Sequence, residues 1–282
     1  MYDAQSYARG AHIRWLKGDL TGAVEMMQAA TDASSPHDPE ASAWTRTRLA
    51  ALHFQAGATA DAESACAEAM ALRPDYPPAL LMRGRMLLAS DDRDAAIDVL
   101  ERAVRANPLP EYEWTFAEAL RADGREQEAA AVEARLRSRG AAADPRTLSL
   151  YLATRGEQPQ LAVRLAEEEF QQRQDVFTCD ALAWALAAAG RLDEARTHMS
   201  RALAEGTDDA RLWLHATVIA ARTGQHEEAA QWLEKAGTLV TLLLPSEVEQ
   251  LQSAAELLAN PELAGAPESF PATDTQFPAV EN

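Results

Sequence analysis

Small and apolar residues recur along the chain with a period of about 34 positions, and polar turn residues separate the repeating units. Each unit has a glycine, or a residue in its place, shortly before an alanine, and successive alanines lie 39, 34, 33, 33, 33 and 34 residues apart. This pattern predicts two helices per unit joined at the glycine, because glycine tolerates the left-handed backbone of a tight turn. The alanines are Ala23, Ala62, Ala96, Ala129, Ala162, Ala195 and Ala229.

Two units depart from the pattern, since Asp91 replaces the glycine before Ala96 and Gly156 lies one residue early before Ala162. The 39-residue step contains an insertion at 32–40, which is interpreted as a polar loop. The first two units predict helices at 6–17, 21–31, 41–55 and 60–72.

The residues at the ends of the units agree with this interpretation. Asp38-Pro39 and Asp144-Pro145 have the pattern of a helix N-cap followed by proline in the first turn. Pro74 and Pro108 lie 34 residues apart and end two second helices. The alanines are expected at helix crossings, where a larger side chain would push the paired helices apart.

With its two helices, small residues at fixed places and closing proline, this unit resembles the tetratricopeptide repeat. The best-matching stretches are 41–108 and 181–236, and the match is weaker over 125–156, where the closing proline is missing. The resemblance implies an all-α fold, a right-handed α-solenoid of about seven repeats over residues 1–237. It also implies that the first helices line a concave groove where partner peptides usually lie. Alanine and arginine usage is typical of a GC-rich genome, and we expect a bacterial protein.

The C-terminal segment differs from the repeats. Ser246-Glu247-Val248-Glu249 has a capping-box pattern, which predicts a capping helix at 246–260 that covers the apolar face of the last repeat. Residues 261–282 are rich in proline and acids and are expected to form a disordered acidic tail. The first repeat begins close to Met1 without a preceding cap, which indicates a fragment of a longer chain or an end that pairs with another protein.

Composition narrows the classes of function. The net charge of −18, from 44 acidic and 26 basic residues, argues against binding to nucleic acid or an anionic membrane. No apolar run is long enough to span a membrane. The two cysteines, Cys66 and Cys179, form neither a disulfide framework nor a zinc pattern, and are expected to be buried thiols. Free thiols fit the cytoplasm, although a removed export signal would leave no trace.

The sequence lacks the common catalytic and metal-binding motifs. The chain has no P-loop, GxSxG, dinucleotide-binding or HExxH motif, and no two of its six histidines are four residues apart. We therefore expect no enzyme activity, no metal and no cofactor.

The repeat register assigns inward positions on each first helix. These positions contain six arginines but only two acids, Glu118 and Asp180, whereas the whole chain is acidic. The predicted groove is therefore basic and aromatic, and His12 and Phe177 share its register. The candidate partner-binding residues are Trp15, Trp44, Arg48, Phe54, Arg85, Trp114, Arg121, Arg146, Trp184, Arg211 and Arg222.

Each candidate also has a structural interpretation. The tryptophans can pack between adjacent helices, and the arginines can pair with glutamates of neighbouring repeats. If they instead face the groove, the partner is a protein or peptide with acidic and apolar side chains. The acidic tail, which contains Phe270 and Phe277, is a further candidate occupant. The family's clamp for chaperone tails depends on lysine and asparagine, and this register has neither, so chaperone-tail binding is not expected.

The primary hypothesis is a non-enzymatic scaffold or adaptor that binds a partner peptide in its concave groove. The alternative is a docking or regulatory module of a larger multidomain protein whose catalytic part lies elsewhere, and an enzyme is the third. Self-association through the alanine-rich outer helices stays open, because no sequence rule exposes such a face.

Overall fold

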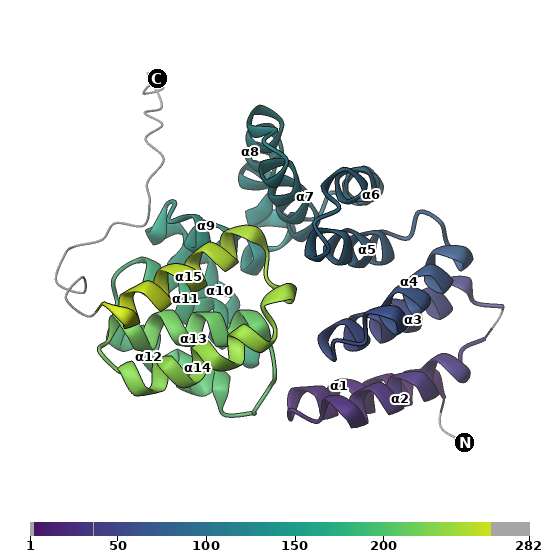
Figure 1. Cartoon of the computed structure of the whole chain (residues 1–282), viewed down its shortest axis with the longest axis horizontal. Coiled ribbons are helices and arrows are strands. Elements are labelled where there is room, and N and C mark those ends of the chain that lie inside the picture. The colour runs from purple at the N-terminus through teal and green to yellow at the C-terminus, as the bar shows by residue number, and fades with distance from the viewer. Residues whose placement is uncertain (1–2, 36, 261–282) are drawn as a thin grey trace.

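The computed structural model describes residues 3–35 and 37–260, and every regular element in these ranges is a helix (Figure 1). The elements are α1 (Ala4–Leu16), α2 (Leu20–Asp32), α3 (Pro39–Gln55), α4 (Thr59–Leu72), α5 (Pro77–Ala89), α6 (Arg93–Ala106), α7 (Pro110–Ala122), α8 (Glu126–Ala143), α9 (Pro145–Arg155), α10 (Pro159–Gln172), α11 (Val176–Ala188), α12 (Leu192–Leu203), α13 (Ala210–Arg222), α14 (His226–Thr238), the 3₁₀ turn η1 (Val240–Leu242) and α15 (Pro245–Ala259).

Within the described residues, the first fourteen helices form seven consecutive pairs, from α1–α2 to α13–α14. The predicted all-α solenoid of about seven repeats is confirmed. The helices predicted over the first two units agree with α1 to α4 to within two residues at every end. The insertion at 32–40 forms the connection between α2 and α3.

The turns within the pairs have the predicted backbone. Asp91, which stands in for glycine, has a φ of 59°, and Gly156 has a φ of 66°. Asp38 and Asp144 cap α3 and α9 by accepting hydrogen bonds from backbone N–H groups three residues ahead. The seven repeat alanines all have an exposed fraction of 0%, so a larger side chain at any of them would disrupt a helix crossing.

The C-terminal helix α15 packs on α13 and α14, as a capping helix should, but it also reaches α9 and α7 across the concave side. The capping box is displaced from its predicted position. Leu244 is the N-cap, and Glu247 Oε2 accepts a hydrogen bond from the Leu244 N–H at 2.8 Å. Ser246 instead donates from its backbone N–H and its hydroxyl to the carboxylate of Glu118 in α7, at 3.0 and 2.5 Å. The segment therefore fills part of the predicted groove.

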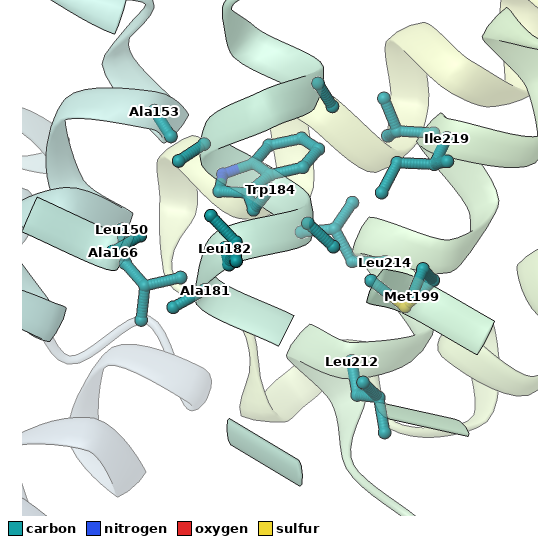
Figure 2. Close-up of a cluster of buried hydrophobic side chains, with 14 of the residues drawn as sticks. Leu150, Ala153, Ala166, Ala181, Leu182, Trp184, Met199, Leu212, Leu214 and Ile219 are labelled. Carbon is teal, nitrogen blue, oxygen red and sulfur yellow. The ribbon is translucent and has the colours of Figure 1, made fainter. Parts of the chain in front are cut away.

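The buried apolar residues form separate clusters. One cluster holds residues of α1 to α5, and a larger one extends from α7 to α15. Figure 2 shows the larger cluster around Trp184, with Leu182, Leu214 and Ile219 nearby. We call α1–α4 the N-terminal lobe and α9–α15 the C-terminal lobe, with α5–α8 joining them.

The two lobes meet at the ends of the solenoid, so that the concave side closes into a ring (Figure 1). Thr207, in the loop before α13, donates a hydrogen bond to the carbonyl of Leu16 at 2.7 Å. Gly18 comes so close to Gly206 that a Cβ atom on Gly18 would lie 2.6 Å from the Gly206 carbonyl oxygen. Helix α1 thus contacts both its own lobe and the opposite one.

Candidate functional site

A cavity of about 400 Å³ lies inside the ring, and every first helix of the seven repeats contributes to its wall. The residues that line it include His12, Trp15, Arg48, Phe54, Arg85, Glu111, Trp114, Arg146, Phe177, Asp180, Asp209, Arg211 and Leu242.

Seven of the eleven predicted partner-binding residues lie at this cavity. Trp114 and Phe54 are nearly buried in its wall, with exposed fractions of 1% and 8%. Trp15 stacks on Phe177 of the opposite lobe, with ring centroids 5.5 Å apart. The seven residues are Trp15, Arg48, Phe54, Arg85, Trp114, Arg146 and Arg211.

The other four candidates do not line the cavity. Trp184 is fully buried, donates its Nε1–H to Thr154 Oγ1 at 3.0 Å and stacks on His215, so its assignment as a partner contact is wrong for this closed structure. Trp44 is 41% exposed near the start of α3, away from the cavity wall.

Arg121 and Arg222 have structural partners instead. Both oxygens of Glu133 accept hydrogen bonds from Arg121, each at 2.8 Å. Arginine–glutamate pairing was the structural alternative, but Glu133 lies in the second helix of the same repeat and not in a neighbouring one. Arg222 donates to the carbonyl of Ala187 at 2.8 Å. These two arginines join helices of the solenoid, and they add no charge to the cavity wall.

The cavity arginines differ in their partners. Arg211 forms a buried ion pair with Glu247, and its guanidinium lies over the Trp114 ring at 5.0 Å. Burial alone would raise the pKa of Glu247, but Arg211 outweighs it, so the pKa of this carboxyl is lowered. Arg85 donates to the Leu242 carbonyl at 2.6 Å and lies 3.8 Å from Glu111.

Two acids of the cavity are also engaged. Asp180 Oδ1 lies 2.8 Å from Nδ1 of the buried His215. Asp209 caps α13 by accepting from the Leu212 N–H at 3.0 Å, and burial raises the pKa of its carboxyl. Neither of these acids pairs with an arginine of the cavity in the described part of the chain.

Arg48 and Arg146 remain without an ion pair or hydrogen bond from their side chains among residues 3–35 and 37–260. Burial lowers the pKa of Arg48, with the nearby Glu111 opposing this effect. Arg146 has a buried Nε without a hydrogen-bond partner, and its guanidinium lies 6.0 Å from the Phe177 ring centre. The groove was predicted to be basic because of six inward arginines. In the described part of the structure, Arg48 and Arg146 are the ones whose charge is available to a ligand.

The repeat register missed several residues of the cavity wall, among them Glu111, Asp209 and Leu242. Glu111 and Asp209 lie at helix starts, where the inward register is least defined. Leu242 lies in η1, outside the repeats, so no periodicity assigns it to the groove.

Both cysteines are free and buried, as predicted. Burial raises the pKa of the Cys66 thiol to about 11. Because the thiolate is the nucleophile, we expect Cys66 at pH 8 to react with a disulfide reagent at least roughly a hundredfold more slowly than an ordinary thiol. The test is a thiol-release assay on a Cys179→Ser variant, with the guanidinium-unfolded chain as control. A fast reaction of the native variant would contradict the buried position.

The described residues contain no group of three or more metal-ligating side chains. None of the helices in the described ranges is both long and apolar enough to cross a membrane. The acidic tail proposed as an occupant of the groove lies outside the described residues.

Two family models, both described as tetratricopeptide repeat, match residues 53–113 and 181–238. The chain is a tetratricopeptide-repeat protein. The matched segments largely overlap the two stretches where the repeat pattern is strongest, and the same helix pairing continues between and around them. No curated protein sequence matches the chain.

Among solved structures, a tetratricopeptide repeat protein from Parabacteroides merdae is 15% identical, with a TM-score of 0.45, and the match covers 91% of this chain and 99% of that one. The Cut9–Hcn1 complex is 15% identical with a TM-score of 0.48, covering 84% and 48%. The TPR2AB domain of yeast Sti1, in a complex with pHSP90, is 14% identical with a TM-score of 0.37, covering 91% and 98%.

Proposed function

We propose that this tetratricopeptide-repeat protein is a non-enzymatic interaction scaffold that binds a short segment of a partner protein in its central cavity. The observation that carries the proposal is the convergence of all seven first helices on one cavity, where Arg48 and Arg146 form no ion pair with any residue of 3–35 or 37–260. Arginine and tryptophan are enriched among residues that dominate binding energy at interfaces. The buried, unpaired thiols fit a reducing compartment, and we propose the cytoplasm.

The size of the cavity limits the bound segment to a few residues. Helix α15 and η1 occupy the part of the concave side against α5, α7 and α9. Their buried hydrogen bonds to Glu118 and Arg211 make displacement costly, because each would leave a charge without its partner. We therefore expect the partner segment to be a compact insertion that does not extend along the whole concave side.

The partner segment is expected to combine an acidic and an apolar side chain. Arg48 and Arg146 offer guanidinium groups to a carboxylate, and Trp15, Phe54 and Phe177 offer apolar surface in the same cavity.

The test is a pull-down from native lysate with the wild type and an Arg48→Glu/Arg146→Glu variant, followed by mass spectrometry. We expect the partner to be lost with the double variant, because charge reversal repels an acidic segment. Arg164→Glu/Arg196→Glu, at exposed positions of α10 and α12, is the matched control with the same change in net charge. If both double variants keep their helical content and recover the same amount of partner, the binding site does not lie in the cavity.

A further inference from the structure

The two cavity arginines whose side chains find no partner in the described part of the chain come from opposite lobes. Arg48 belongs to α3 in the N-terminal lobe, and Arg146 belongs to α9 in the C-terminal lobe. Both face the same cavity, although nearly a hundred residues separate them along the chain. Any group that contacts both would therefore bridge the lobes.

Within the described residues, few side chains join the two lobes directly, and the apolar ones among them are only partly buried. Leu16 of α1 packs against the C-terminal cluster, and Leu242 of η1 packs against the N-terminal cluster. The Trp15–Phe177 stack and the Thr207 hydrogen bond to Leu16 add one contact each. Among the described residues, Gln55 Nε2 also donates to the Asp208 carbonyl, and Lys17 forms an ion pair with Glu205. The closure thus depends on a small number of side chains.

Two positive charges at this junction oppose closure. Like charges in a partly buried cavity repel each other, and each also loses hydration that no ion pair within the described residues replaces. Glu111 opposes the effect of burial on the pKa of Arg48, but this carboxylate also lies 3.8 Å from Arg85. Burial and Arg48 lower the pKa of His12, so at neutral pH the imidazole adds little further charge.

We propose that the cavity holds a carboxylate or another oxyanion between Arg48 and Arg146, and that this group fastens the two lobes of the ring together. The proposal rests on the proposed function, in which the oxyanion belongs to the inserted segment of a partner protein. A free small anion has the same chemistry and can occupy the same position. The bound anion would supply the hydrogen-bond acceptors that both guanidinium groups lack.

The structure offers a route to this position. A second hollow, of about 700 Å³, adjoins the cavity and shares His12, Arg146 and Phe177 with it. Its wall includes Ile13, which is 60% exposed, so this side is open to solvent. Four basic residues line the hollow, Lys17, Arg146, Arg173 and Arg201, against two acids, Asp175 and Glu205. Its wall is therefore net positive, which favours the approach of an anion.

The test uses citrate as the probe, with thermal unfolding and isothermal titration at constant ionic strength set by sodium chloride. We expect citrate to raise the unfolding temperature of the wild type. Arg48→Gln and Arg146→Gln should each weaken citrate binding by about tenfold to a hundredfold, as expected for a lost charge-assisted hydrogen bond. Arg164→Gln is the control and should bind citrate like the wild type. Citrate binding that is absent, or equal in all variants, would overturn the anion site.

Closure is measured separately by hydrogen exchange of the backbone amides in residues 205–208. We expect citrate to slow exchange there in the wild type and to leave it unchanged in Arg48→Gln. If citrate binding depends on the two arginines but leaves amide exchange in residues 205–208 unchanged, the anion site stands. The proposal that the anion fastens the lobes would then be wrong.

The two proposals fail in distinguishable ways. If the captured partner is lost with Arg48→Glu/Arg146→Glu but citrate does not bind, the cavity binds protein and the anion site is wrong. If citrate binds through both arginines but partner recovery is unaffected, the scaffold proposal for this cavity is wrong.

To assign the source of the oxyanion, the captured partner is washed with citrate and, separately, with chloride of equal ionic strength. Release by citrate alone supports a carboxylate of the partner, and equal release would overturn that assignment.

Discussion

Replacing Arg211 by alanine is expected to destabilise the protein by about 3–5 kcal/mol, the usual cost of leaving a buried charge unpaired. Glu247, its partner, has an exposed fraction of 0% and also accepts the Leu244 N–H, which fixes the start of α15. Without Arg211 the carboxylate keeps only that backbone donor, and Trp114 loses the guanidinium over its ring. The free energy of unfolding is measured by urea denaturation followed by circular dichroism.

The loss of stability should depend on pH. In the wild type, the lowered pKa of Glu247 contributes stability above the pKa of the unfolded chain, and that contribution disappears as the pH falls. In Arg211→Ala, burial is no longer opposed by the guanidinium and raises the pKa of Glu247. The variant therefore keeps its stability at acid pH, where Glu247 is protonated, and loses stability as the pH rises. The difference between the two proteins should therefore shrink towards pH 4.

Two controls separate a buried pair from a general charge effect. Arg105→Ala removes an exposed partner of Glu101 and is expected to change stability by less than about 1 kcal/mol. Arg211→Met/Glu247→Leu removes both charges and should recover much of the stability lost in the single variant. If Arg211→Ala costs no more than Arg105→Ala, the pair does not fix α15.

Replacing Trp184 by alanine is expected to cost about 3–5 kcal/mol, because it opens a large cavity in the core of the C-terminal lobe (Figure 2). The indole is fully buried and stacks on the His215 ring, with the two ring centroids 4.2 Å apart. Its Nε1–H donates a hydrogen bond to Thr154 Oγ1. Guanidinium denaturation monitored by circular dichroism gives the change in free energy.

Trp44→Ala is the matched control, since this tryptophan is 41% exposed. We expect a change within about 0.5 kcal/mol for it. Citrate binding should be unaffected in the Trp44 variant, which lies outside the cavity. Equal destabilisation by the two substitutions would contradict the different positions that the structure gives them.

The sequence by itself determined the repeat and its helical pairs. Ala62 and Ala195 are fully buried and Asp91 adopts a positive φ, as their places in the period predicted. These features are local, because a turn and a helix crossing depend on residues within one unit of about 34 positions. The inner register also held for Arg48, Arg146 and five other candidates, because helical periodicity fixes the face on which a residue lies.

Only the tertiary structure decided which inward residues remain accessible. Trp184 and Arg121 share the inner register with Arg48, yet the first is covered by its neighbours and the second pairs with Glu133. The sequence also could not place α15 across the concave side, because η1 and the start of α15 lie outside the period. Closure into a ring accumulates from small rotations between successive repeats, so no single unit encodes it. The groove expected from periodicity is therefore an enclosed cavity, defined by contacts such as Thr207 with Leu16 that join the two ends of the solenoid.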